Sequence, residues 1–161
     1  MSALVWAASA VWASELDGVW RFEKETNAHA DGTPAAVPSA AYSGLIIYTA
    51  DGHVSATIMP KDRHWTIANA TFKDLMNSVG EGASTAYAGR FEVDPVARTV
   101  THIPDVSIDP ADIGQRLVRH YQVSGDELLL SGKWKYQGEE LTFTVHWRRV
   151  EPIAAGASHD R

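Results

Sequence analysis

The groups of this chain that could do chemistry inside a folded domain are an arginine, a histidine and several tyrosines set in alternating apolar stretches. Arg119 shares strand parity with three apolar or aromatic neighbours, so it faces the interior if they do. A guanidinium cannot lose its proton and needs a carboxylate, a carbonyl or an anionic ligand there. Arg119 therefore has either a structural or a functional role. In the first it forms an internal ion pair or extends to solvent at the rim, and in the second it anchors a ligand's carboxylate, phenolate or enolate. The neighbours are Leu117, Tyr121 and Val123, of which Tyr121 is also a candidate ligand contact.

His102 is the second candidate. It shares parity with Val100, whereas Thr99, Thr101 and Ile103 take the opposite face, so the apolar signal is weakly one-sided. One interpretation is a core histidine whose ring nitrogens are hydrogen-bonded. The other is a general acid or base, because an unperturbed histidine has a pKa of about 6.5.

Residues 44–59, GLIIYTADGHVSATIM, carry the strongest local structural signal. Asp51-Gly52 lies between two apolar, β-branched runs, which predicts a hairpin with a two-residue type I′ turn. That turn would pair Tyr48 with Ser55. One face would then be apolar with hydroxyl groups, as suits a ligand cavity, and the other purely apolar. The first face comprises Ile46, Tyr48, Ser55 and Thr57, and the second Leu45, Ile47, Ala56 and Ile58.

Further candidate ligand contacts come from neighbouring stretches. Tyr87 and Phe91 are both candidates and share strand parity with Val93. The Tyr87 hydroxyl either makes a structural hydrogen bond or donates to a ligand oxygen. Residues 60–65 connect the hairpin to a helical stretch, and we expect them at the mouth of the barrel. There His64 could transfer a proton and Trp65 could form a lid contact, the alternative being a solvated loop.

Metal and cofactor chemistry has no sequence support. The chain has no cysteine, and its seven histidines show neither H-x-H nor H-E-x-x-H spacing. Parity places His120 and His146 on the outside. There is no glycine-rich phosphate loop and no G-x-S-x-G motif, so we expect neither metal nor cofactor.

Length and charge narrow the class of protein. A chain of 161 residues is the size of one domain, and a net charge of −6 argues against nucleic acid as a partner. We expect the domain at 14–151, with a flexible tail at 152–161. The apolar residues 1–13 are either a signal-peptide remnant or a short packed helix, and they are too short to span a membrane. The localisation is accordingly cytoplasmic, or periplasmic or secreted if a signal peptide is present.

The elements that must position these side chains are mostly strands. Alternating stretches separated by turns predict eight to ten antiparallel strands, with one short amphipathic helix at 69–80. The strands include 14–24, 87–93, 98–103, 115–123, 127–130, 133–136 and 140–150. Such a meander removes its edges by closing into an up-and-down barrel, and a sandwich is the alternative.

Several stretches resemble the bacterial lipocalin-like family within the calycin group. They are LDGVWRFEKE, GLIIYTADGHVSATIMPKDR, AYAGRFEVD with TVTHI, and GQRLVRHYQVSGDELLL, and Gly18-Val19-Trp20 is similar to the G-x-W start motif. The resemblance implies an antiparallel all-β barrel with a small-molecule cavity. It also implies that Arg148 or Arg149 packs over Trp20 and closes the barrel floor.

Three functions remain open. The first is binding of a small hydrophobic molecule, with Arg119, His102 and Tyr48 as polar anchors. The second is a cofactor-free cyclase, isomerase or lyase (dehydratase), in which His102 or His64 moves a proton while Arg119 and a tyrosine stabilise an oxyanion. The third is a structural domain that forms a homodimer through the apolar hairpin face.

Overall fold

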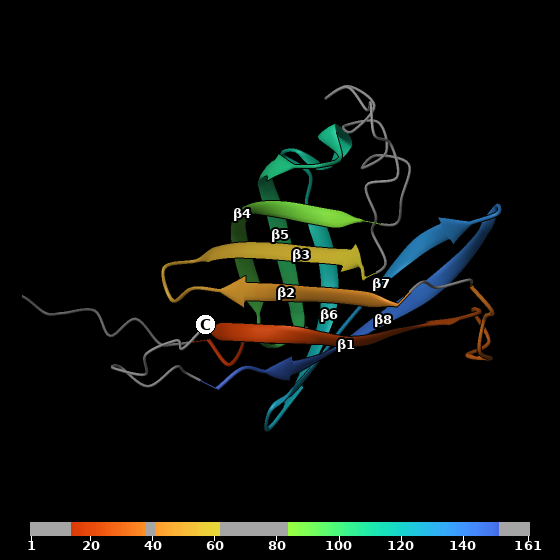
Figure 1. Cartoon of the computed structure of the whole chain (residues 1–161), viewed down its shortest axis with the longest axis horizontal. Helices are drawn as coiled ribbons and strands as arrows, with labels where there is room; N and C mark the ends of the chain where they lie inside the picture. Colours follow the sequence, from red (N-terminus) through yellow and green to blue (C-terminus); the bar gives the residue numbers. More distant parts are fainter. Residues whose placement is uncertain (1–13, 38–40, 62–83, 152–161) are drawn as a thin grey trace, which may run out of the picture.

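The computed structural model describes residues 14–37, 41–61 and 84–151 of the chain. Within them, eight antiparallel strands close into an up-and-down barrel in which each strand pairs with its sequence neighbours and β8 pairs with β1 (Figure 1). The expected all-β barrel is thereby confirmed. The elements are β1 (Gly18–Ala28), β2 (Tyr42–Tyr48), β3 (His53–Pro60), β4 (Thr85–Asp94), β5 (Thr99–Ser107), a 3₁₀ turn η1 (Pro110–Asp112), β6 (Leu117–Ser124), β7 (Glu127–Tyr136) and β8 (Glu139–Arg149).

The β2–β3 hairpin forms as predicted, but its register differs by one residue. Tyr48 pairs with Val54 rather than Ser55, because Thr49 also pairs with His53 and leaves a three-residue loop. Of the two turn residues only Gly52 has positive φ, at 89°, which excludes a type I′ turn and fits a type I turn followed by a glycine bulge. A shift of one residue exchanges the faces of β3. The interior face is Ile46, Tyr48, Val54, Ala56 and Ile58, and the outer face is Leu45, Ile47, Ser55 and Thr57.

A bulge in β1 changes which side chains face the interior. Phe22 pairs with Trp147 and Lys24 with His146, so the register shifts between Phe22 and Lys24. After the shift it is Glu25, opposite Val145, that follows Phe22 on the inner face. The open end of the barrel therefore receives polar groups that simple alternation would place outside.

Strand β7 is continuous through Ser131 and Gly132, where the sequence suggested a break between two strands. Gly132 pairs with Phe143 of β8, and a Cβ there would lie 2.8 Å from the Phe143 ring and 3.1 Å from Cδ of Arg119. This glycine is therefore required by space and does not end the strand.

One end of the barrel is closed by Trp20, which is completely buried. Its indole Nε1 donates to the carbonyl of Leu16 at 2.7 Å, and the Arg149 guanidinium lies 3.9 Å from the ring centre. Arg149 also donates to the carbonyl oxygens of Asp17 and Glu15, at 2.6 and 3.0 Å. This contact confirms the expected floor and assigns it to Arg149.

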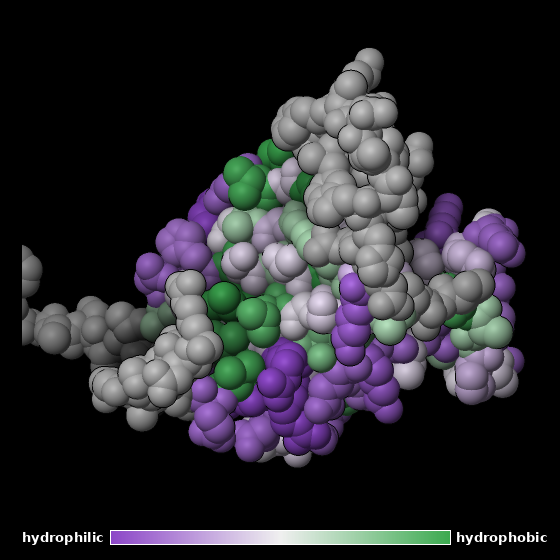
Figure 2. Space-filling model, in the orientation of Figure 1, coloured by the Kyte–Doolittle hydropathy of each residue, from purple (hydrophilic) through white to green (hydrophobic). Residues whose placement is uncertain are grey.

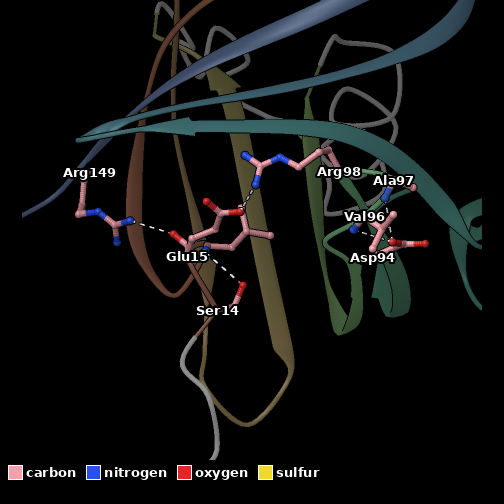
Figure 3. A network of polar contacts seen from close by, with 8 residues as sticks. Ser14, Glu15, Asp94, Val96, Ala97, Arg98 and Arg149 are labelled. Carbon is pink, nitrogen blue, oxygen red and sulfur yellow. Dashed lines mark hydrogen bonds and ion pairs between the residues drawn. The ribbon is translucent and has the colours of Figure 1, made fainter.

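A second arginine ties the same end together. Arg98 forms an ion pair with the Glu15 carboxylate (Figure 3). Its guanidinium also stacks 4.5 Å from the centre of the Tyr121 ring. Figure 3 shows that Glu15 receives Arg98 at its side chain and Arg149 at its backbone, so the short segment before β1 is held by the β4–β5 turn and by the end of β8.

The outer face of the β2–β3 hairpin is not the purely apolar face that was proposed as a dimer interface. Ile58 lines the interior, while Leu45 and Ile47 share the outer face with Ser55 and Thr57. Exposed apolar side chains do occur, as Leu45 is 43% and Val106 61% exposed. Figure 2 shows hydrophobic side chains among weakly polar ones on one face of the molecule, with strongly hydrophilic groups along its lower edge. The one-residue change of register accounts for the difference.

Several predictions lie outside the described residues: the segment at 1–13, the loop with His64 and Trp65, the helix at 69–80 and the tail at 152–161. No helix in the described part of the chain has the length and apolar character to cross a membrane.

Candidate functional site

The barrel contains a cavity of about 610 Å³ that extends from the buried core to exposed residues at the open end. This is the size range of small-molecule sites, which combine mostly apolar walls with a few polar groups. Each of the eight strands contributes residues to the wall of the cavity. Trp20, at the closed end, is not among them. Apolar and aromatic lining residues include Phe22, Tyr42, Ile46, Ala56, Ile58, Leu130, Trp134, Phe143, Val145 and Trp147.

His102 lies in the wall with both ring nitrogens hydrogen-bonded. Nε2 is 2.7 Å from the Tyr48 hydroxyl and Nδ1 is 2.6 Å from the Tyr87 hydroxyl. The three side chains come from β5, β2 and β4, and alternation within each strand directs them inward to the same place. His102 and Tyr48 are each only 1% exposed, whereas Tyr87 is partly exposed and lines the cavity.

Burial keeps all three groups neutral. Desolvation, with a smaller effect of the Arg119 charge, lowers the pKa of His102 to about 3. Desolvation raises the pKa of Tyr87 to about 12 and that of Tyr48 well above its ordinary value. A histidine that is neutral at pH 7 and engaged at both nitrogens is suited to positioning Tyr87, which leaves Tyr87 as the group able to contact a ligand.

Arg119 also lines the cavity. Its side chain crosses Gly132 on β7 and brings the guanidinium 5.1 Å from the centre of the Phe143 ring on β8. Its one hydrogen bond among the described residues goes from Nη1 to the carbonyl of Val118 at 3.0 Å, and it joins none of the ion pairs found there. The remaining N–H donors are therefore available to a ligand.

Polar groups at the open end were missed by the sequence analysis. Asn27 accepts a hydrogen bond from Trp134 Nε1 at 2.9 Å and donates to the exposed Glu25 carboxylate at 3.1 Å. Both Asn27 and Glu25 line the cavity because of the β1 bulge. The sequence predicted that this strand ends at Lys24, whereas β1 continues to Ala28. A bulge also has no reliable signal in a single sequence, so neither residue was placed on the inner face.

Other sequence-predicted residues fall in different places. Tyr48 lies beneath the cavity and reaches it through His102, and Phe91 packs edge-on against Tyr48 with ring centres 5.0 Å apart. Tyr121 is buried near the floor, under Arg98, and is not among the lining residues. Ser55 is exposed on the outer face, so its prediction as a ligand contact is wrong, for the reason of register given above.

The outward-facing histidines lie as alternation predicts: His120 is exposed and His146 lies on the outer face of β8. In residues 14–37, 41–61 and 84–151 no three His, Asp or Glu side chains come together in a way that could hold a metal ion.

Comparison with known proteins supports the resemblance. The family described as the lipocalin-like domain matches residues 17–150, which is most of the chain and the whole of the barrel. Searches of curated proteins and of solved structures gave no match. The chain belongs to the lipocalin-like domain family.

Proposed function

We propose that this protein binds a small, predominantly apolar molecule inside the barrel, with the polar part of the molecule at Tyr87 and Arg119. The cavity carries this proposal: about 610 Å³, apolar on most sides, with a hydroxyl and a guanidinium at the wall. Burial of apolar ligand surface supplies the affinity, and the two polar groups supply orientation. The family match supports small-ligand binding in general.

The test compares two neighbouring positions on β3 that face opposite sides. Ala56 is 3% exposed and lines the cavity, whereas Ser55 is exposed on the outer wall. We expect Ala56→Phe to fill the cavity and abolish binding of the neutral fluorophore N-phenyl-1-naphthylamine, and Ser55→Phe to leave it unchanged. Equal binding by both variants would place the fluorophore on the surface and refute the proposal.

A second candidate is a cofactor-free isomerase, cyclase or lyase. The observation that favours it is the neutral Tyr87 hydroxyl, held by His102 on the same cavity as the Arg119 guanidinium. Such a pair could stabilise an enolate as it forms, with Tyr87 in contact with the oxygen and His102 as a positioning residue.

Native mass spectrometry of freshly isolated protein separates these two functions. A pure binding protein should release a co-purified molecule unchanged after prolonged incubation. An enzyme should convert it, and Tyr87→Phe should then lower kcat by roughly 10²-fold. Conversion at an unchanged rate in Tyr87→Phe would exclude this catalytic role.

A further inference from the structure

The direction of the hydrogen bonds around His102 determines what the cavity offers to a ligand. A neutral imidazole has one N–H donor and one acceptor nitrogen, so it donates to one tyrosine and accepts from the other. Two arrangements are possible. Either Nδ1–H donates to Tyr87 and Nε2 accepts from Tyr48, or the two roles are reversed.

The environment of Tyr48 distinguishes these arrangements. Its side chain is 1% exposed, and within the described residues its hydroxyl has His102 Nε2 as its one partner. If Nε2 carried the proton, the Tyr48 hydroxyl hydrogen would have no acceptor and would bear the desolvation cost of a buried, unpaired donor. The arrangement with the proton on Nδ1 satisfies Tyr48, since its hydroxyl then donates to Nε2.

The consequence appears at Tyr87. When Nδ1–H donates to its oxygen, the Tyr87 hydroxyl hydrogen is free to point elsewhere, and Tyr87 lines the cavity. It therefore presents a hydrogen-bond donor to the contents of the barrel. A tyrosine that stays protonated up to a pKa of about 12 keeps this role at any physiological pH.

The charges on the cavity favour an acceptor that is negative. Arg119 supplies a guanidinium that joins no ion pair among the described residues and lies close enough to affect the pKa values of His102 and Tyr87. Of the lining residues, Glu25 is the carboxylate, and it is exposed at the open end with Asn27 hydrogen-bonded to it. Asp112 also acts on Tyr87, and its carboxylate is hydrogen-bonded to Ser107.

We propose that the cavity selects apolar molecules that end in an anionic oxygen, such as a carboxylate, which accepts from the Tyr87 hydroxyl and is neutralised by Arg119. This inference rests on the proposed function and specifies its ligand class. It also explains why a polar trio is buried in an otherwise apolar barrel, since the trio fixes one donor in one direction.

The test uses three molecules with the same chain and different head groups: decanoate, 1-decanol and decylammonium. Isothermal titration calorimetry at pH 7.5 and constant ionic strength should show decanoate binding at least tenfold more tightly than 1-decanol, with decylammonium weakest. Tyr87→Phe and Arg119→Gln should each weaken decanoate binding by roughly tenfold, because a hydrogen bond to a charged group is lost. Binding of 1-decanol should change much less.

Matched controls exist for both variants. Tyr121→Phe removes a hydroxyl near the floor, and Arg116→Gln removes an exposed arginine that pairs with Glu92. Both should bind decanoate as the unmodified protein does. If all three molecules bind equally, or decylammonium binds best, the anion inference fails while the proposed function stands. If none binds, both fail.

The position of the proton on the His102 ring can be measured directly. Nitrogen-15 NMR of labelled protein identifies which ring nitrogen of His102 carries the proton, with His102→Gln to assign the signals. We expect Nδ1 to be protonated and Nε2 to be an acceptor. A proton on Nε2 would make Tyr87 donate to His102 instead, and would overturn the argument whatever the binding data show.

Discussion

The two ends of the barrel each place an arginine against an aromatic ring, and the two arginines differ in what else they bond. At the floor, Arg149 lies 3.9 Å from the centre of the Trp20 ring and donates to two backbone carbonyls. In the cavity, Arg119 lies 5.1 Å from the centre of the Phe143 ring and donates to one. The floor arginine is occupied by the protein itself, whereas the cavity arginine keeps most of its donors free.

This contrast separates structure from function on physical grounds. A polar group whose hydrogen bonds are all made inside the protein stabilises the fold. A substitution there should affect the free energy of unfolding more than the affinity for a ligand. A polar group left with free donors in an enclosed space contributes little to the fold but can orient a ligand. The four predictions below test whether the two ends of the molecule divide in this way.

The largest expected effect is at the floor. Trp20→Ala should lower the free energy of unfolding by about 3–5 kcal/mol, since it removes a completely buried ring that Arg149 covers. Trp134→Ala, at the partly exposed open end, should cost less than half as much. Urea denaturation followed by circular dichroism measures both values. Equal losses would mean that the open end is as structural as the floor.

The arginines themselves give the second comparison. Arg149→Met should lower the free energy of unfolding by about 2 kcal/mol, because a cation–π contact and two hydrogen bonds to carbonyls are lost. Arg119→Met should change it by less than about 1 kcal/mol, since one exposed hydrogen bond is lost. Urea denaturation of the two variants measures both changes in unfolding free energy. A larger loss at Arg119 would indicate a structural role and remove it from the binding site.

The fold and the floor could be predicted from the sequence further than the contacts of the cavity. The barrel, the inward placement of His102 and Tyr48 and the floor arginine all follow from strand alternation or from the family resemblance, because these features are set by local patterns. Alternation gives the face of a side chain within one strand. It does not give the partner across the barrel, so the contact of His102 with two tyrosines could not be predicted.

The errors arose where the chain departs from regular alternation. One extra residue in the β2–β3 loop moved Ser55 from the inner face to the outer, and the β1 bulge brought Glu25 and Asn27 inside. Both changes involve a single residue of backbone, and a glycine after an aspartate fits either hairpin loop. The prediction of a strand break at Gly132 was wrong for a different reason. A glycine is needed there because side chains from β6 and β8 occupy the space that a Cβ would take.

Gly132 provides the third prediction. Gly132→Ala places a methyl group 2.8 Å from the Phe143 ring and 3.1 Å from Arg119 Cδ, so both side chains must move. We expect a loss of about 1–3 kcal/mol in unfolding free energy from this overpacking, together with weaker ligand binding. The matched control is Gly125→Ala, in an open turn where an added Cβ meets no atom but must adopt a φ of 58°. That control should lower stability without changing binding.

The fourth prediction concerns the pH dependence of stability. The pKa of His102 is about 3 in the folded protein, below the value of about 6.5 in an unfolded chain, so the unfolded state binds the extra proton between these values.

Stability should therefore fall as the pH decreases below about 6.5, by up to about 2 kcal/mol between pH 7 and pH 5. His102→Gln should lose this contribution and show a flatter profile over the same interval, even if its stability at pH 7 is lower. His120→Gln removes an exposed histidine and should keep the original slope. Chemical denaturation at several pH values gives the three slopes directly. Parallel profiles for all three proteins would mean that His102 titrates normally, which would contradict the neutral, doubly hydrogen-bonded imidazole on which the donor at Tyr87 depends.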